Sequence, residues 1–175
     1  MQRYLAGFGG ASGSGKTTLI ERLVVLMRAR GLRVSVIKHA HHGVDIDRAG
    51  KDSWRHREAG ACEVLLASPR LLALQRASQV DVAYTVDELA RMLQPVDWIL
   101  VEGYRGAPVP RIEVWRSAAA PQPRDIDPHV VAVACDEPAR MSVACRVPCL
   151  DLNSPETVAE WLLAHRDRFV HADDR

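Results

Sequence analysis

The chain has 175 residues, of which 47% are hydrophobic and 26% are charged. This composition is typical of a globular chain with enough apolar side chains for a buried core, and it excludes an intrinsically disordered protein. Its 23 Lys and Arg residues against 22 Asp and Glu residues give a net charge of +1. The overall charge therefore offers no attraction to nucleic acid or to an anionic membrane.

No apolar stretch of the sequence is long enough for a transmembrane helix, which needs about 18 or more apolar residues. The longest apolar stretches, such as residues 98–101 and 130–134, are far shorter. The N-terminal segment also reaches its glycines too early for the apolar region of a signal peptide. We therefore expect a cytoplasmic protein with neither a membrane nor a nucleic acid as its partner.

The beginning of the chain has the pattern of a βαβ unit. Residues 4–8 predict a short strand, and after a glycine-rich turn apolar residues recur at helical spacing from Leu19 to Met27. Residues 32–37 predict a second strand, which ends at the polar residues 38–42. The unit is complete within about forty residues, which is close to the usual size of this motif.

Strands and helices continue to alternate along the rest of the chain. Thr85 with Glu88 forms a capping-box pattern, and Ser154 with Pro155 has the pattern of a helix start. Further helices are predicted over 51–59, 86–93 and 154–165, and further strands over 63–67, 71–75, 98–101, 111–115 and 130–134. This order predicts an α/β chain with a three-layer architecture and a mainly parallel central sheet.

The sequence shows neither an internal repeat nor a second domain boundary. We therefore expect a single nucleotide-binding domain over residues 1–175, with a flexible tail from about residue 166. The nucleotide-binding part of this expectation rests on one motif near the N-terminus.

Residues 10–18 (GASGSGKTT) match the P-loop pattern GxxxxGK[ST] between a predicted strand and a predicted helix. Glycines let backbone N–H groups point inward around a polyphosphate, and the helix N-terminus faces the same anion. We expect Lys16 to reach the β- and γ-phosphates and Thr17 to bind Mg²⁺. The other expected nucleotide contacts are Gly10, Ser12, Gly13, Ser14, Gly15 and Thr18. The alternative is an ordinary glycine-rich turn in which Thr18 and Glu21 cap the helix.

Glu102 follows the buried strand 98–101 and is followed by Gly103. In parallel sheets, metal and catalytic groups lie at the carboxyl ends of strands. We therefore expect Glu102 to hold Mg²⁺ through water or to orient an attacking water, as a catalytic residue together with Lys16, while Gly103 lets the backbone approach the γ-phosphate. The alternative is a solvated acid at a strand end.

Residues 38–42 (KHAHH) come at the end of the second predicted strand, which we expect beside the strand that leads into the P-loop. Imidazoles at this place could bind a transition metal, or the Lys and His side chains could contact anionic oxygen. Asp45 and Asp47 follow and add carboxylate oxygens, and Asp45 is a further candidate metal ligand.

Only three of the basic residues are lysines, namely Lys16, Lys38 and Lys51, whereas 20 are arginines. Lys38 ends the second predicted strand, and Lys51 lies in a GKDS turn before the polar helix 51–59. All three lie in segments predicted to face phosphate. This placement favours a need for a compact ammonium group over chance.

The chain resembles the MobB-type molybdopterin-guanine dinucleotide biosynthesis adaptor proteins over its whole length. The segments that carry the resemblance are 10–18 (GASGSGKTT), 37–61 (IKHAHHGVDIDRAGKDSWRHREAGA), 100–105 (LVEGYR) and 130–136 (VVAVACD). The first segment alone would indicate only a three-layer P-loop NTPase fold. The second is long and unusual enough to indicate the family.

The resemblance implies a dimeric GTP-binding protein with slow GTPase activity that acts mainly as a nucleotide-dependent adaptor. Its partner would be a MobA-type molybdenum cofactor guanylyltransferase, which joins GMP to molybdenum-bound molybdopterin. The P-loop residues would then bind GTP, and Thr17 with Glu102 would form the Mg²⁺ site. Direct contact between molybdopterin and this chain is left open.

Guanine specificity rests on the resemblance, because the sequence has no NKxD motif. Asp136, which follows the strand 130–134, is the candidate to accept hydrogen bonds from guanine N1 and N2. Ala49 stands where relatives often have Pro, and Arg105 where Lys is frequent, and neither change removes a phosphate ligand.

Two other functions fit the motifs. In a P-loop small-molecule kinase, His41, Asp45 or Arg57 would position an acceptor hydroxyl. In a GTP-dependent metallochaperone, His39, His41 and His42 would be metal ligands. The sequence has no obvious second substrate domain or lid, which favours an accessory protein over a kinase.

Overall fold

The computed structural model of the chain describes residues 2–40, 47–78, 80–119, 127–138 and 146–172. Its contacts divide the chain into two compact units, one formed by Met1–His39 with Thr85–Arg175 and the other by Ala40–Tyr84. We describe each unit by itself, and the single-domain organisation expected from the sequence stays a prediction.

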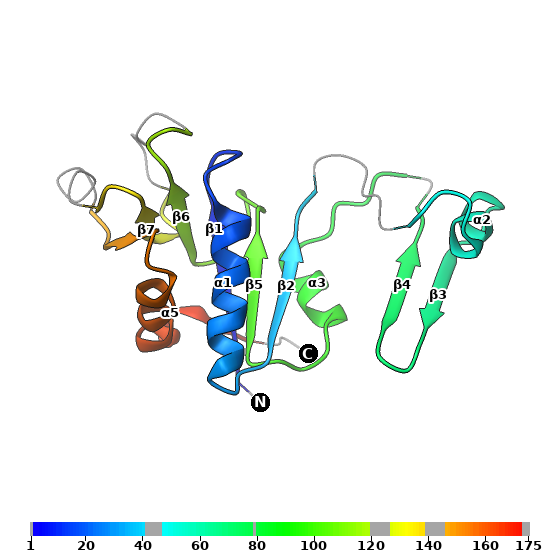
Figure 1. Cartoon of the computed structure of the whole chain (residues 1–175), viewed down its shortest axis with the longest axis horizontal. Helices are drawn as coiled ribbons and strands as arrows, with labels where there is room; N and C mark the ends of the chain where they lie inside the picture. The colour runs from blue at the N-terminus through cyan, green and yellow to red at the C-terminus, as the bar shows by residue number, and fades with distance from the viewer. Residues whose placement is uncertain (1, 41–46, 79, 120–126, 139–145, 173–175) are drawn as a thin grey trace. The chain divides into compact units, whose positions relative to one another are not determined.

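The larger unit is built on a seven-stranded sheet with the order β2-β5-β1-β6-β7-β8, in which β9 pairs with β1 off this path (Figure 1). The strands are β1 (Arg3–Gly9), β2 (Val34–Lys38), β5 (Trp98–Glu102), β6 (Arg111–Trp115), β7 (Val130–Cys135), β8 (Cys149–Asp151) and β9 (Val170–His171). All pairs along the path are parallel, and the β1–β9 pair is antiparallel. The predicted mainly parallel sheet is confirmed, with β8 and β9 as strands that the sequence pattern did not reveal.

Helices cover both faces of this sheet. The helices of the larger unit are α1 (Lys16–Ala29), α3 (Val86–Met92), α5 (Pro155–Ala164) and the 3₁₀ helix η1 (Arg166–Phe169). Alternate residues of β5 point to opposite faces, so that Leu100 packs in a core with α1 and α5, whereas Ile99 packs in a core with α3. This arrangement confirms the predicted three-layer α/β architecture. None of the helices within the described residues has the length and apolar character needed to span a membrane.

The two predicted helix starts differ in how they are capped. At α3 the capping box is confirmed, because the Thr85 hydroxyl accepts from the Glu88 amide while the Glu88 carboxylate accepts from the Thr85 amide. These contacts hold the pKa of Glu88 below its ordinary value, since the Thr85 amide and hydroxyl both stabilise the carboxylate. At α5 Ser154 is the N-cap residue and Pro155 follows it, but the Ser154 hydroxyl lies 2.8 Å from Thr157 Oγ1 and makes no capping bond.

The segment after α5 departs from the flexible tail that the sequence predicts from about residue 166. Residues 166–169 form η1, and Val170–His171 pairs with β1. Phe169 is only 1% exposed, and its ring centroid lies 5.9 Å from that of Trp98 and 6.2 Å from that of Trp161. One aromatic side chain in a polar sequence therefore holds this segment on the core. Sequence reasoning missed it because the neighbouring residues are charged.

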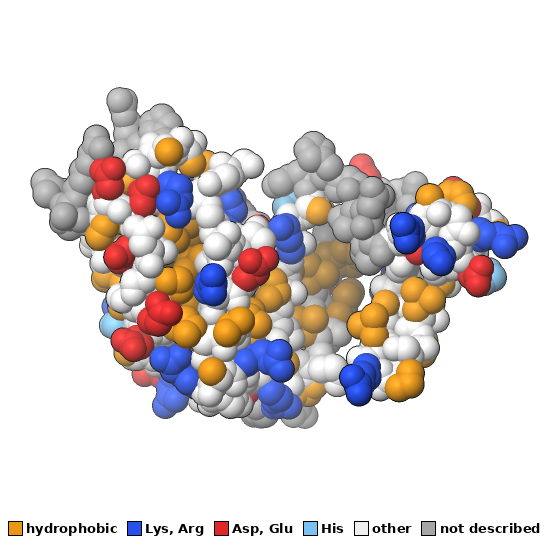
Figure 2. Space-filling model, viewed as in Figure 1, with side chains coloured by type: hydrophobic (Ala, Val, Ile, Leu, Met, Phe, Trp, Pro, Cys, Tyr) orange, Lys and Arg blue, Asp and Glu red, His pale blue; other side chains and the backbone are white. Residues whose placement is uncertain are grey.

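The smaller unit consists of α2 (Asp52–Glu58) and a two-stranded antiparallel sheet of β3 (Glu63–Ala67) and β4 (Leu72–Arg76). The helix and both strands are confirmed, with β4 displaced by one residue from the predicted range. Leu65, Leu72 and Leu74 share one face of the sheet and are 61%, 69% and 52% exposed. Figure 2 shows hydrophobic side chains on the surface over β3 and β4.

Candidate functional site

The P-loop joins the carboxyl end of β1 to the start of α1, as the sequence predicts. Gly10, Gly13 and Gly15 all have positive φ, at +131°, +76° and +97°. At Gly10 a side chain is also excluded by space, because a Cβ would lie 2.2 Å from the Val114 carbonyl oxygen. The loop therefore needs glycine at this position for both conformation and packing.

The start of α1 presents free backbone N–H groups to this loop. Gly15 is the N-cap residue, and the described residues provide no side-chain cap and no acidic residue in the first turn. The alternative of a helix capped by Thr18 and Glu21 is therefore wrong. Unsatisfied N–H groups and the positive end of the helix dipole together favour an anion at this place.

The Lys16 side chain folds back across the loop. Its Nζ donates hydrogen bonds to the carbonyl oxygens of Gly10 at 3.0 Å and Ala11 at 2.6 Å. Ser14 is only 1% exposed, and within the described part of the chain its hydroxyl has no hydrogen-bond partner. An unpaired buried hydroxyl costs about 1–3 kcal/mol. The loop thus combines an ammonium group with an unsatisfied hydroxyl, and polyphosphate oxygens fit both.

Thr17 and Glu102 meet at the carboxyl ends of β1 and β5, as the sequence predicts. Thr17 Oγ1 donates to Glu102 Oε1 at 2.7 Å, although 85 positions separate the two residues. The Glu102 side chain is only 10% exposed, and the Lys38 Nζ lies 3.3 Å from the same oxygen. A hydroxyl beside a carboxylate supplies the hard oxygen ligands that Mg²⁺ prefers, so these residues fit that ion.

Lys38 reaches Glu102 because β2 pairs with β5, in the register Lys38↔Glu102. The sequence analysis expected β2 beside β1, and this expectation is wrong, since β5 lies between them. The order of strands in the chain does not determine their order in the sheet. In this sheet β5 lies between β1 and β2, although β2 follows β1 in the chain. As a result, the end of β2 lies beside Glu102 and not beside the P-loop backbone.

Gly103 lies where the sequence predicts a close backbone approach, although the neighbour is His39. Its φ is +91°, its N–H donates to the Phe8 carbonyl, and a Cβ would lie 3.0 Å from the His39 Cβ. The His39 amide in turn donates to the Glu102 carbonyl, and the His39 ring lies 4.6 Å from the Tyr104 ring in a tilted arrangement. His39, directly after β2, is therefore in contact with the residues at and after the end of β5.

The predicted histidine and aspartate cluster is only partly described. His41, His42 and the candidate metal ligand Asp45 lie outside the described residues. Asp47 belongs to the smaller unit and accepts a hydrogen bond of 2.9 Å from Ser53. In the ranges that the structure describes, no three His, Cys, Asp or Glu side chains come together as a metal site.

Asp136 follows β7 and lies with Arg116 and Ser117, the residues that follow β6. Its oxygens accept from the Ser117 amide at 3.0 Å and from the Ser117 hydroxyl at 3.1 Å, and Oδ2 lies 3.9 Å from a guanidinium nitrogen of Arg116. Partial burial raises the pKa of Asp136, but the Ser117 contacts and the charge of Arg116 outweigh it and hold the pKa below its ordinary value. Asp136 is therefore an ionised carboxylate at neutral pH.

The structure thus brings the predicted residues into two groups. Thr17 and Glu102 lie together on the β5 side of β1, Lys16 contacts the backbone of the loop itself, and Asp136 lies beyond β6 on the other side. Sequence reasoning did not include Arg116, which lies beside Gly15 of the P-loop. The rule that identified Glu102, a charged residue directly after a buried strand, would have found Arg116 as well.

Comparisons with known proteins identify the family of this chain. The family model described as "MobB: Molybdopterin guanine dinucleotide synthesis protein B" matches residues 5–136. The molybdopterin-guanine dinucleotide biosynthesis adapter protein of Haemophilus influenzae is 39% identical over 160 residues, which are 90% of this chain and 86% of that protein. The protein of the same name from Escherichia coli is 37% identical over 163 residues, which are 91% of each chain.

Two solved structures match the fold of this chain. The crystal structure of molybdopterin-guanine biosynthesis protein B (mobB) matches with a TM-score of 0.70 and 31% sequence identity, over 91% of this chain and 98% of that one. The crystal structure of Bacillus subtilis MobB, with a TM-score of 0.72 and 24% identity, supports the fold alone. The family resemblance expected from the sequence and the three-layer P-loop fold are both confirmed. The chain belongs to the MobB family of molybdopterin guanine dinucleotide synthesis proteins.

Proposed function

We propose that this chain is a GTP-binding adaptor with slow GTPase activity, which assists a MobA-type guanylyltransferase in forming molybdopterin guanine dinucleotide. Membership of the MobB family supports the role in this biosynthesis. The observation that carries the nucleotide-dependent part is the meeting of Lys16, Thr17 and Glu102 around one loop. These are the residue types that P-loop proteins use for phosphate and magnesium.

The P-loop would bind the phosphates. Backbone N–H groups and hydroxyls would surround them, and Lys16 would leave its carbonyl partners for the β- and γ-phosphates. The proposed nucleotide ligands are Gly10, Ser12, Gly13, Ser14, Gly15, Lys16, Thr17, Thr18, Gly103 and Asp136. The buried hydroxyl of Ser14 supports this assignment, because phosphate oxygen would satisfy it.

Mg²⁺ would be held by Thr17 directly and by Glu102 directly or through water. When bound, this ion would neutralise charge that develops on the phosphates. Glu102 is also the carboxylate best placed to orient a water, which supports slow hydrolysis as a property of the same site. Asp45 stays a candidate for the metal from the sequence alone.

Asp136 would read the guanine base. An ionised carboxylate accepts hydrogen bonds from the N1 and N2 donors of guanine, whereas adenine offers an acceptor at N1. The lowered pKa of Asp136 supports this role, because the carboxylate is ionised at neutral pH. Its place after β7, beyond β6 from the metal side, also suits the nucleoside end of a bound nucleotide.

The adaptor would be a homodimer. The exposed leucines of β3 and β4 support this proposal, because Leu65, Leu72 and Leu74 form an apolar face on a small sheet. A two-stranded sheet is marginally stable alone, and a second copy that covers this face would stabilise it.

The kinase function would use His41, Asp45 or Arg57, and the metallochaperone function would use His39, His41 and His42. Of these residues the structure describes His39 and Arg57. The adaptor function, in contrast, is supported by contacts within the larger unit and by family membership. We therefore propose it as the function of this chain.

Calorimetry of GTP, ATP and molybdopterin in the presence of Mg²⁺, with and without the guanylyltransferase, tests the proposal. We expect GTP to bind more tightly than ATP and the partner enzyme to associate with the GTP-bound chain. Lys16→Ala should lower GTP affinity by about 100-fold or more, because charged contacts to phosphate are lost. Equal binding of ATP and GTP would remove the guanine assignment, and undiminished binding by Lys16→Ala would remove the P-loop site.

A further inference from the structure

Arg116 lies beside the last glycine of the P-loop. It directly follows β6, which pairs in parallel with β1, so the carboxyl end of β6 lies next to the loop. A Cβ built on Gly15 would lie 3.6 Å from an Nη atom of Arg116 and 3.9 Å from its Nε. The guanidinium therefore lies near Gly15, on the side where a side chain at that position would point.

Positive charge gathers at this helix start. A helix N-terminus favours negative charge, yet the first turn of α1 contains no acidic residue. Lys16 occupies the first helical position, and Arg116 adds a second cation beside Gly15. Asp136 offsets part of the Arg116 charge, and an anion bound at the loop would interact favourably with Arg116, Lys16 and the helix dipole together. The buried, unpaired hydroxyl of Ser14 in the same loop independently indicates a polar ligand.

The Arg116 guanidinium lies beside Asp136 and is partly exposed to solvent. One Nη atom lies 3.9 Å from Asp136 Oδ2, and Ser117 fixes that carboxylate through its amide and hydroxyl. The Arg116 side chain is 39% exposed. Asp136 therefore restrains Arg116 near Gly15 without enclosing it, and the guanidinium has more N–H donors than this one contact uses.

The side of the loop on which Arg116 lies identifies the part of the ligand that it meets. Thr17 and Glu102, the proposed Mg²⁺ ligands, lie on the β5 side of β1, whereas Arg116 lies on the β6 side. Mg²⁺ held by these two residues would neutralise charge on the terminal phosphates. A nucleotide oriented by that ion would direct its α-phosphate and nucleoside away from Glu102 and toward Arg116.

We propose that Arg116 binds the α-phosphate of the nucleotide in the P-loop, and that Asp136 and Ser117 position its guanidinium. This inference rests on the proposed nucleotide binding and names a further binding residue for that site. A guanidinium beside the α-phosphate contacts a group that is the same in GTP and GDP. It therefore contributes to holding the nucleotide in both states, not to sensing the γ-phosphate.

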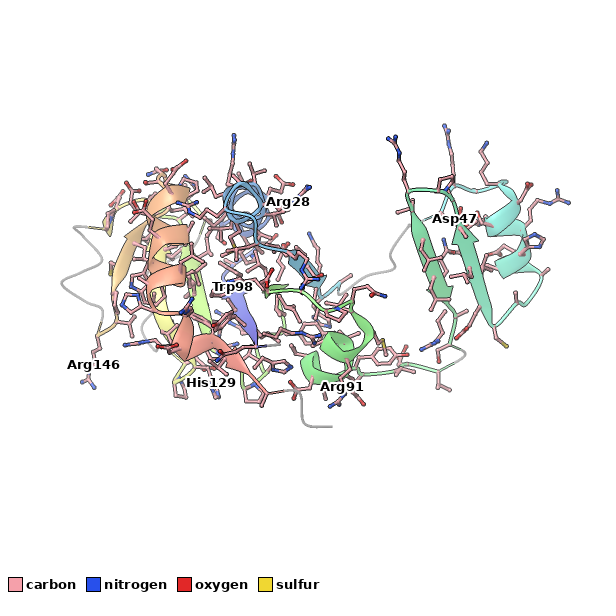
Figure 3. The ribbon with its side chains drawn as sticks, turned by 90° about the horizontal axis from the view of Figure 1, so that it is seen from below. Arg28, Asp47, Arg91, Trp98, His129 and Arg146 are labelled. Carbon is pink, nitrogen blue, oxygen red and sulfur yellow. The ribbon has the colours of Figure 1, made fainter. Side chains whose placement is uncertain are left out.

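Calorimetry with GDP and with GTP in the presence of Mg²⁺ tests this proposal on the full chain. The proteins are the wild type, Arg116→Ala, Arg116→Lys and the control Arg28→Ala. Arg28 lies in the last turn of α1 (Figure 3), at the other end of the helix. We expect Arg116→Ala to weaken GDP and GTP binding by the same factor, about tenfold or more. Arg116→Lys should lose less, and Arg28→Ala should bind like the wild type.

Phosphorus NMR of bound GDP gives a second readout that a purely structural role would not move. We expect the α-phosphorus resonance to shift between the wild type and Arg116→Lys, with a smaller shift at the β-phosphorus. Unchanged affinities and an unchanged α resonance would overturn the proposal, as would a loss confined to GTP. If Arg116→Ala does not fold by circular dichroism, Arg116→Lys and the NMR comparison decide. A wild type that binds neither nucleotide would instead overturn the proposed function.

Discussion

The Thr17 hydroxyl donates a hydrogen bond of 2.7 Å to Glu102 Oε1, and this contact joins the start of α1 to the carboxyl end of β5. The two residues come from separate motifs in the sequence, and the parallel pairing of β1 with β5 brings them together. The Lys38 ammonium lies 3.3 Å from the same oxygen. A single carboxylate thus contacts a hydroxyl from the start of α1 and an ammonium from the end of β2.

Thr17→Ala should remove the dependence of nucleotide binding on Mg²⁺. The substitution removes the hydroxyl that would bind the ion and leaves the backbone of the loop unchanged. We expect Mg²⁺ to raise wild-type affinity for GTP, and this gain to fall by about tenfold or more in the variant. Titrations of GTP with Mg²⁺ and with a chelator measure the effect. Thr17→Ser keeps a hydroxyl and should retain the gain, and a full gain in Thr17→Ala would contradict the assignment.

Asp136→Asn should reduce the preference for GTP over ATP. An amide in place of the carboxylate presents a donor to guanine N1, so we expect the ratio of the two dissociation constants to fall by about tenfold. Competition binding with both nucleotides measures this ratio. Ser117→Ala is the matched control, because it removes a hydrogen bond to Asp136 but keeps the carboxylate. An equal loss for GTP and ATP in Asp136→Asn would show that Asp136 does not read the base.

Acid should weaken the contribution of the Asp136 contacts to stability. The pKa of Asp136 is lower in the folded chain than its ordinary value of 3.8, so ionised Asp136 stabilises the fold above that value. This stabilisation is lost as the pH falls through the folded pKa. We expect Asp136→Asn to lower the melting temperature at pH 7 and the difference from wild type to shrink below about pH 4. A difference that grows on acidification would exclude this cause.

Gly10→Ala should destabilise the fold more than Gly13→Ala. Both glycines have positive φ, but a Cβ at Gly10 would lie 2.2 Å from the Val114 carbonyl oxygen, whereas at Gly13 it would meet nothing within 4 Å. We expect a loss of about 3 kcal/mol or more at Gly10, from strain and overpacking together, and about 1 kcal/mol at Gly13. Urea unfolding of both variants measures the difference, and equal losses would mean that conformation alone matters.

Phe169→Ala should lower the free energy of unfolding by about 3–5 kcal/mol, the usual cost of removing a buried aromatic ring. The ring is 1% exposed and lies against Trp98 and Trp161. Val170→Ala is the control, since Val170 is 47% exposed and should change stability little. Thermal and denaturant unfolding give the comparison. A variant at Phe169 as stable as the wild type would restore the flexible tail that the sequence suggests.

The P-loop, Glu102 and the alternation of helices and strands could be predicted from the sequence, because each depends on residues that are close together in the chain. The contact of Lys38 with Glu102 could not, since it depends on which strands are neighbours. Arg116 could have been noted as a charged residue directly after a buried strand, but its closeness to Gly15 could not be predicted, since it follows from the pairing of β1 with β6. Phe169 was missed because a single buried ring produces no periodic pattern.

The pairing of β9 with β1 brings together two segments that are far apart in the sequence, in the register Arg3↔His171. The strand that leads into the P-loop therefore has one partner, β9, that is synthesised later than its parallel partners β5 and β6. A short linker between these neighbouring positions would allow a circular permutant, with new ends placed in a surface loop. In such a permutant β9 and β1 would be adjacent in the sequence, and their pairing would be kept.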